Sequence, residues 1–282
     1  MIKKIRPYFV LSFFLAISIG CSIEGPKKSY ILAEKLWGEG KYAEAVSEFD
    51  KVVQKDPKGK LGIQALYRSA MTQTLFLNQH EESIKKLQTY IMISSENETV
   101  WSAKLQIGRI LFDRLEKHEQ AIEYYRSLIK EKPDAEEVPE ILFLIGKALF
   151  QLWKFDEAIK QYQEVLSLYA DTEWAEKALF EIGETHFISA KEDEEKISHN
   201  KKKKEKNSFE KATEAYESFI KQYPKSHLVP QARFGIAMCL EEQDRLDEAL
   251  LKYEELLPVY PHAQVIQIKM IRINQRIDKK NR

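Results

Sequence analysis

The residue types that most often do chemistry are present in this 282-residue chain, but their spacing forms no catalytic arrangement. The six histidines are scattered, no two of them stand at metal-ligand spacing, and neither a glycine-rich phosphate loop nor a Gly-x-Ser-x-Gly elbow occurs. Adjacent carboxylates such as Glu136 and Glu137, or Glu254 and Glu255, are typical of solvated helix faces. The sequence therefore predicts no enzyme activity, no metal, no cofactor and no small-molecule substrate. A site assembled from distant loops is left open.

Cys21 stands in surroundings that predict a chemical modification. Met1–Gly20 starts with three basic residues and continues as an apolar run from Tyr8 to Ile19, which indicates a secretory signal and is too short for a comfortable membrane span. The small residues before Cys21 resemble the lipobox of bacterial lipoproteins, in which the cysteine carries lipid and becomes the mature N-terminus. A simple cleaved signal and an uncleaved anchor are the alternatives.

Lipid on Cys21 would be the chain's attachment to a membrane. A cysteine with several acyl chains holds stably without a further membrane segment. The residue after it is Ser22 and not Asp, which favours the outer membrane, on the periplasmic side, over retention at the inner membrane. Residues 21–28 then form a short tether. The second cysteine, Cys239, has no partner for a disulfide within the mature chain and is expected to fill space between helices.

The charge balance excludes one class of partner. The chain carries 44 basic and 44 acidic residues, so it lacks the positive field that binds nucleic acid. We therefore expect proteins or peptides as partners.

A repeated motif organises most of the sequence. Tyr42-Ala43-Glu44-Ala45-Val46, followed by Phe49, Val52 and Pro57, returns five more times, once weakly, with small anchor residues at positions 45, 83, 121, 158, 212 and 249. Four of the five spacings are 37 or 38 residues, which is typical of a helical repeat array. Offsets of four and three place the anchor and the next two apolar residues on one helix face, and a following proline ends that helix.

The motif resembles the tetratricopeptide repeat (TPR) family over roughly residues 28–262. The resemblance implies an all-α fold, a right-handed TPR α-α superhelix of about six helix pairs, with residues 29–262 as one continuous array. First helices carry a small residue where helices approach closely, and Gly40 suits the tight turn between helices. The third unit has one extra residue, which we expect in its internal turn. An irregular helical bundle is the alternative.

Aromatic residues on the expected first helices form two rows, seven residues apart, on one face. In the TPR family this face often contacts peptides, and two arginines beside the rows could grip a carboxylate. The predicted partner-binding groove contains Tyr30, Trp37, Arg68, Arg109, Phe112, Phe143, Phe150, Phe180, Phe187 and Phe234. The alternative is that neighbouring units bury these rings as packing.

Two segments fall outside the repeat. Residues 191–207 are a charged insertion in the fifth unit, rich in Lys and Glu and without Pro or Gly, so we expect both helices of that unit to extend as a hairpin with its tip near Ser198–Asn200. A solvated loop is the alternative. Residues 263–282 read as a helix that caps the array and a basic tail. A basic docking helix for another protein is the alternative.

A lipid-anchored TPR array of this size resembles the BamD (YfiO) family of outer-membrane assembly lipoproteins. The features that carry this resemblance are Cys21, the repeats, and the segment Gln222–His227 leading into Ala232-Arg233-Phe234. It implies a scaffold that docks to an outer-membrane β-barrel assembly factor. The same segments also occur in periplasmic TPR coordinators of the CpoB type, which implies the alternative of a module that captures client peptides or cell-wall enzymes.

Overall fold

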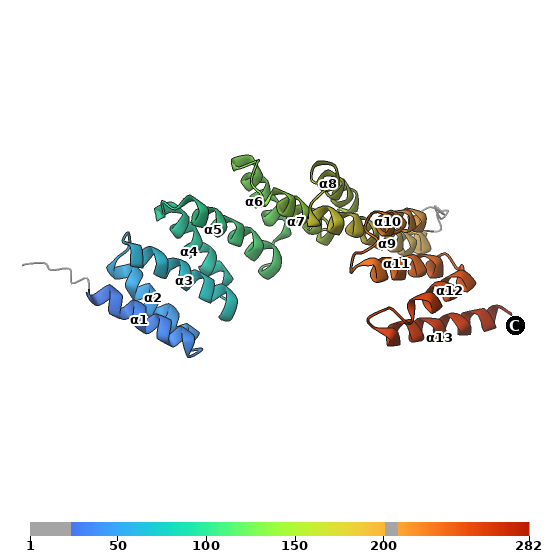
Figure 1. The fold of residues 1–282 in the computed structure, drawn as a ribbon, viewed down its shortest axis with the longest axis horizontal. Coiled ribbons are helices and arrows are strands. Elements are labelled where there is room, and N and C mark those ends of the chain that lie inside the picture. Colours follow the sequence, from blue (N-terminus) through green and yellow to red (C-terminus); the bar gives the residue numbers. More distant parts are fainter. Residues whose placement is uncertain (1–23, 201–207, 282) are drawn as a thin grey trace, which may run out of the picture. The chain divides into compact units, whose positions relative to one another are not determined.

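A computed structural model describes residues 24–200 and 208–281, and every regular element in these two ranges is a helix (Figure 1). The expected all-α fold is confirmed. The chain divides into two compact units, with the boundary between Ala103 and Lys104, whereas one continuous array was expected from the sequence. Each unit is described separately below.

The first unit contains two complete helix pairs and the start of a third. Pair one is α1 (Glu24–Gly38) with α2 (Tyr42–Lys55), and pair two is α3 (Lys60–Phe76) with α4 (His80–Ile93). The boundary falls inside α5 (Asn97–Arg109). Pair one is closed by a core of Ala33, Ala45, Phe49, Val52 and Ala65, in which the last residue comes from α3.

The second unit continues with helices of the same kind. Its elements are η1 (Ile110–Arg114), α6 (His118–Glu131), α7 (Val138–Gln151), α8 (Phe155–Leu168), α9 (Glu173–Asn200), α10 (Ser208–Gln222), α11 (Val229–Glu242), α12 (Leu246–Leu256) and α13 (Ala263–Lys280). Pair three is α5–η1 with α6, and pairs four to six are α7 with α8, α9 with α10, and α11 with α12. Four of the second helices end two residues before a proline, since proline cannot continue a helix; these prolines are Pro57, Pro133, Pro224 and Pro258.

A three-residue turn of constant shape joins the helices in five of the pairs. Its middle residue stands five positions before the anchor and has a positive φ, as expected for Gly40 at φ 75°. Four of the five turns place a side chain in this left-handed conformation, which costs about 1–2 kcal/mol for residues other than glycine. The turn residues with positive φ are Gly40, Asn78, Glu116, Trp153 and Asp244.

The extra residue of pair three is not in the turn, so that expectation is wrong. Glu116 lies five positions before Ala121, as in the other turns, and the surplus is absorbed upstream in η1. There the Leu115 amide donates to the Ile110 carbonyl at 3.0 Å, an i to i+5 bond that defines a π turn. Ile110 and Leu111 stay buried across this turn, so the π turn keeps the apolar face in register.

A tyrosine ring seated on a glycine sets the spacing of the helices in pairs three to five. Tyr125 lies against Gly108 and Tyr162 against Gly146, and a β-carbon at Gly146 would be 2.4 Å from Cε1 of Tyr162. Tyr216 lies between Gly183 of its own pair and Gly235 of pair six. These positions therefore exclude any side chain beyond hydrogen while the rings keep their places.

The hydroxyl groups of these buried rings differ in their partners. Tyr216 donates to Glu184 at 2.7 Å, and Tyr253 of pair six donates to Glu241 at 3.1 Å. Tyr125 and Tyr162 have no hydrogen-bond partner for their hydroxyls among the described residues. Burial raises the pKa of the Glu184 carboxyl, although the hydrogen bond from Tyr216 opposes this shift.

The charged insertion lengthens one helix in the part of the chain that is described. α9 runs for 28 residues to Asn200, twice the 14 of α7, whereas α10 begins at Ser208, only four residues before its anchor. The turn expected near Ser198–Asn200 is therefore wrong, because the strong helix formers Lys and Glu continue α9 through it. The basic run at 201–204 lies outside the described residues.

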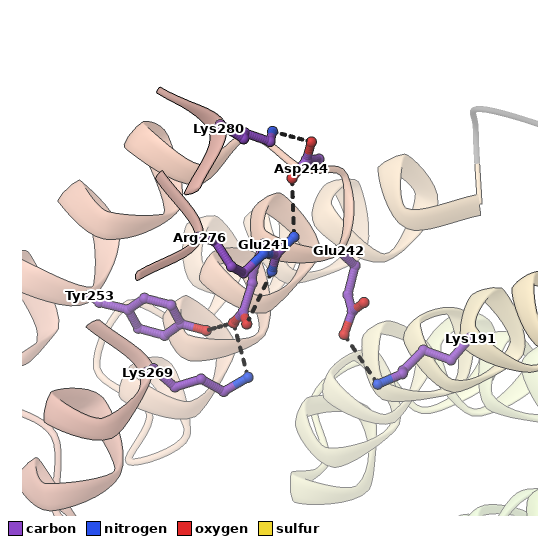
Figure 2. A network of polar contacts seen from close by, with 8 residues as sticks. All are labelled: Lys191, Glu241, Glu242, Asp244, Tyr253, Lys269, Arg276 and Lys280. Atoms are coloured by element: carbon purple, nitrogen blue, oxygen red, sulfur yellow. Dashed lines mark hydrogen bonds and ion pairs between the residues drawn. The ribbon is translucent and has the colours of Figure 1, made fainter. Parts of the chain in front are cut away.

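Ion pairs and two isoleucines hold α13 on pair six. Ile266 and Ile273 are fully buried against α11 and α12. Figure 2 shows Glu241 accepting from Tyr253 and from Lys269 at 2.9 Å, while Arg276 reaches both Glu241 and Asp244. The outer side of α13 exposes a further apolar stripe, made of Val265, Ile268 and Ile271. The helix covers the last pair, and the docking alternative stays open.

The N-terminal boundary differs from the expected tether. α1 begins at Glu24, so residues 24–28 are helical, and Pro26 is tolerated because it stands in the first turn. The signal segment and Cys21 lie outside the described residues. Over those residues, none of the helices has the length and apolar character that a membrane crossing requires.

We predict that the two tyrosine hydroxyls contribute differently to stability. Tyr216→Phe removes the donor to the largely buried Glu184 and is expected to lower the free energy of unfolding by about 1–3 kcal/mol. Tyr162→Phe removes a hydroxyl without a partner and is expected to stay within about 0.5 kcal/mol of the parent or to gain stability. Urea unfolding measures both, and equal losses would contradict the assignment.

We predict that glycine at a left-handed turn position stabilises the chain. Glu116 is exposed and has a φ of 51°, so Glu116→Gly is expected to raise the free energy of unfolding by about 0.5–1 kcal/mol. The matched control is Glu123→Gly on the exposed face of α6, where glycine costs about 1 kcal/mol. Thermal unfolding of both variants compares them. A loss of stability in Glu116→Gly would show that the turn is not under this strain.

Candidate functional site

The first unit contains a pocket of about 680 Å³, within the range of about 300–1,000 Å³ that is usual for ligand sites. It lies where α1, α3 and the end of α4 meet the start of α5. Its lining residues are Tyr30, Lys60, Ile63, Gln64, Tyr67, Arg68, Tyr90, Ser94, Ser95, Glu96, Thr99 and Ser102. The pocket is built by two walls of different chemistry.

One wall is aromatic and apolar. Tyr30 from α1 packs edge-on against Phe49 at 5.6 Å between ring centroids, and Tyr67 from α3 lies 5.2 Å from Tyr90 of α4. Ile63, one helical turn before Tyr67, extends the wall. Burial raises the pKa of both Tyr30 and Tyr67, so both hydroxyls stay protonated at neutral pH and can donate to a ligand.

The other wall is a row of hydroxyl groups. Ser94 and Ser95 follow α4, and Thr99 and Ser102 stand on the first turns of α5. The Tyr90 hydroxyl donates to Thr99 at 2.7 Å and so joins the two walls. Hydroxyls donate and accept, which suits the alternating N–H and C=O groups of an extended peptide.

Arg68 is fixed in place between the walls. It makes a two-point contact with Glu34 of α1, at 2.9 Å from Nε and 2.6 Å from Nη2, and its guanidinium lies 4.9 Å above the Trp37 ring. The carboxylate that was expected from a ligand is therefore supplied by the chain itself. Any acidic ligand group would have to compete with Glu34.

The structure brings together only part of the groove predicted from the sequence. Tyr30 and Arg68 line the pocket, and Trp37 lies beneath Arg68. Arg109, in the second unit, is held by Glu140 at 2.7 Å, as Arg68 is held by Glu34. The pairs Glu34–Arg68 and Arg109–Glu140 join first helices of successive repeats, and Lys147–Glu181 at 2.9 Å does the same for α7 and α9.

Each predicted aromatic residue of the second unit contacts a ring of its own helix pair, and Phe143 also contacts Trp174 of the next pair. Phe143 and Phe187 are only 8% and 5% exposed. Phe143 packs between Tyr162 and Trp174, and Phe187 packs against Phe209.

The remaining four rings follow the same rule. Ring centroids are 5.5 to 6.0 Å apart in the contacts Phe112 with His118, Phe150 with Phe155, Phe180 with Tyr216, and Phe234 with Tyr253. These contacts account for the rings as packing. Their role in partner binding stays a prediction.

Sequence reasoning missed most of the pocket lining. Tyr67 precedes the small-residue position of pair two by four residues, and Thr99 starts the next helix, so neither belongs to the aromatic rows. The available signal was the irregularity of pair two, where Met71 replaces the usual small residue of the first helix and Ser83 replaces the usual alanine anchor. Ser83 is fully buried, donates to the Ala70 carbonyl and accepts from Thr74, both at 2.7 Å.

Other candidate chemistry is weak. Cys239 is fully buried, and burial raises the pKa of its thiol to about 12, so it remains protonated and unreactive at neutral pH. Across residues 24–200 and 208–281 no cluster of three or more His, Cys, Asp or Glu residues is placed to hold a metal ion.

Family comparisons identify the repeat. Three tetratricopeptide repeat models match the chain, over residues 102–135, 139–171 and 204–263. These segments fall on pairs three, four and six and on the second helix of pair five. The chain therefore contains tetratricopeptide repeats, as the spacing of its anchors predicted. No curated protein sequence matches the chain.

Solved structures show the same fold. The C-terminal part of a TPR repeat-containing protein from Cytophaga hutchinsonii is 18% identical, with a TM-score of 0.59 over 88% of this chain and 86% of that one. Yeast Tom70 is 18% identical, with a TM-score of 0.51 over 84% of this chain and 44% of that one. PilW, a type IV pilus biogenesis factor, is 13% identical, with a TM-score of 0.50 over 86% and 98%. At these identities the likeness concerns the fold.

Proposed function

We propose that this chain is a lipid-anchored TPR scaffold of the bacterial cell envelope that binds extended protein segments in the tyrosine-lined pocket of its first unit. TPR repeats are scaffolds for protein–protein interaction, and this coarse function follows from the repeats themselves. The anchor on Cys21, the outer-membrane location facing the periplasm and the nature of the partner are parts of the proposal.

The pairing of an aromatic wall with a hydroxyl wall supports peptide binding. Tyr67 and Ile63 offer apolar surface to side chains, while Ser94, Ser95 and Ser102 offer donors and acceptors to a peptide backbone. The pocket also carries Lys60 at the start of α3 and Glu96 in the connection between α4 and α5, so it has no single sign of charge. An extended segment with mixed polar and apolar residues fits this lining better than a strongly charged one.

Two finer roles follow from the two resemblances. In the first, the scaffold works with an outer-membrane β-barrel assembly factor, as the resemblance to the BamD family implies. In the second, it is a periplasmic coordinator of the CpoB type that captures client peptides or cell-wall enzymes. The pocket specifically favours the capture of a peptide, which the second role requires and the first role can use for client proteins.

We predict that peptide binding depends on Tyr67. The probe is a set of fluorescein-labelled ten-residue peptides from the strands of outer-membrane β-barrel proteins, with scrambled versions beside them. Tyr67→Ala is expected to weaken binding by at least about tenfold, because a central ring in a pocket carries a large share of the binding energy. Fluorescence polarisation measures the affinity.

The matched control for this variant is Tyr42→Ala. Tyr42 lies in the same unit and stacks on Phe76 at 3.9 Å, but it does not line the pocket. Circular dichroism establishes that both variants remain helical. If the two variants weaken binding equally, or if neither does, the pocket is not the peptide site.

We predict that the protein recovered from cell envelopes begins at Cys21 and carries acyl chains. Mass spectrometry of the N-terminal peptide detects them, and Cys21→Ser is expected to release the protein from the membrane fraction. Crosslinking and pull-down from the same envelopes then separate the two roles. A large β-barrel protein as the main partner supports the first role, and cell-wall enzymes support the second. An intact Met1 without lipid would refute the anchor.

A further inference from the structure

The outer face of α1 combines exposed apolar residues with lysines. Ile31 is 59% exposed and Leu32 is 43% exposed, although both are large aliphatic residues on a well-formed helix. Lys28 and Lys35 are exposed one helical turn before and after them, and Lys27 lies beside Lys28. Offsets of three, four and seven residues place this set on one side of the helix.

The position of Ile31 in the repeat explains why its side chain is exposed to solvent. It stands two residues before the small residue Ala33, and the equivalent residue in pair six is Gly235. Gly235 lies against Tyr216 of the preceding pair, whereas α1 has no preceding pair among the described residues. The terminal face of a repeat array is normally polar, because nothing covers it. The aliphatic side chains on α1 depart from that rule and indicate an occupant.

The charges on this face point to a negatively charged occupant. Three lysines and one acid, Glu24, share this side of α1 with the two aliphatic residues, which leaves the face with a net positive charge. The nearby acid Glu34 is turned to the pocket side, where it is bound by Arg68. Lys35 also lies 3.8 Å from Glu39 at the far end of α1, and Lys28 takes part in an interaction within the chain as well. A second copy of the chain docked face to face would bring lysines against lysines, which disfavours self-association through this surface.

The chain length before α1 limits what can reach this face. If Cys21 carries the lipid, only Ser22 and Ile23 separate it from Glu24, and these three steps along the chain reach about 10 Å even when fully extended. Ile31 lies a further seven residues along the helix, about 10 Å. Too little chain remains to fold over α1, and the bilayer that holds the lipid is always close to it.

We propose that the outer face of α1, formed by Lys27, Lys28, Ile31, Leu32 and Lys35, lies on an anionic lipid surface. The aliphatic residues enter the boundary between headgroups and acyl chains, and the lysines contact lipid phosphates. This inference rests on the proposed lipid anchor and adds a second membrane contact to it. This contact fixes the orientation of the first unit on the membrane, which the lipid anchor alone would not do.

A spin label at residue 32 tests the contact in the mature, membrane-extracted protein. Leu32→Cys accepts the label selectively. Cys21 is expected to carry lipid, and the thiol of Cys239 is buried and has a raised pKa, so neither reacts with the label. The control label is at Leu168→Cys, a position that is 62% exposed in the second unit. Both proteins are reconstituted into vesicles of phosphatidylethanolamine and phosphatidylglycerol, and the accessibility of each label to oxygen and to a water-soluble nickel complex is measured.

The label at residue 32 is expected to lose access to nickel and gain access to oxygen, while the label at residue 168 remains accessible to nickel. Lys27→Gln with Lys35→Gln, or vesicles of phosphatidylcholine alone, are expected to return the first label to water. Labels that behave alike in anionic vesicles overturn the inference, as does spin–spin broadening between copies, which would show self-association. The mass of the N-terminal peptide separates the causes. If Cys21 carries lipid but the label at residue 32 stays in water, the anchor stands and this contact is refuted. If Cys21 carries no lipid, the anchor on which this inference rests is refuted.

Discussion

The close approach of a tyrosine ring to the bare backbone of a glycine is the contact on which pairs three to five of the repeat depend. In pair four a β-carbon at Gly146 would overlap the Tyr162 ring, and pairs three and five repeat the arrangement with Gly108 and Gly183. The ring is among the largest fully buried side chains, so it carries much of the apolar burial of its pair. Its fit against glycine fixes how closely the two helices pack. The turns within the pairs and the ion pairs between first helices form at the helix spacing that this contact sets.

Pair two lacks both the ring and the small residue of this contact. Leu87 stands where the other second helices carry an aromatic residue, and Met71 stands where the first helices carry a small one. The rings of this pair, Tyr67 and Tyr90, lie elsewhere, and they line the pocket of the first unit. In the same pair Ser83 stands where the other anchors are alanine. Its buried hydroxyl makes hydrogen bonds to Thr74 and to the Ala70 carbonyl on the other helix of the pair. The helix pair that fits the repeat motif least is therefore the pair that supplies residues to the candidate site.

Local features of the fold were predictable because they depend on nearby residues. The anchors, the prolines and Gly40 predict the helix pairs and their turns, since each acts within one helix or turn. The errors arose where two local solutions compete. An extra residue can enlarge a turn or form a π turn, and the buried Ile110 and Leu111 favour the second. A helix can start before or after Pro26, and the first turn accepts it.

The candidate site was less predictable because its residues come together only through packing. Tyr30, Tyr67 and Thr99 belong to three helices, and no spacing in the sequence relates them. Arg68 was predicted for the groove and lines the pocket, but its partner Glu34 lies 34 residues away on another helix. The sequence contains the aromatic residues of both the packing contacts and the pocket. Only the three-dimensional arrangement separates them.

A double-mutant cycle on Gly146 and Tyr162 tests the central contact most directly. Gly146→Ala, Tyr162→Leu and the double variant are compared by urea unfolding, with Gly38→Ala as the control, because a β-carbon there meets no atom within 4 Å. The account predicts that Gly146→Ala is strongly destabilising alone, that Gly38→Ala is not, and that the double variant is more stable than the sum of the single losses by about 1–3 kcal/mol. Additive losses, or a neutral Gly146→Ala, would contradict it.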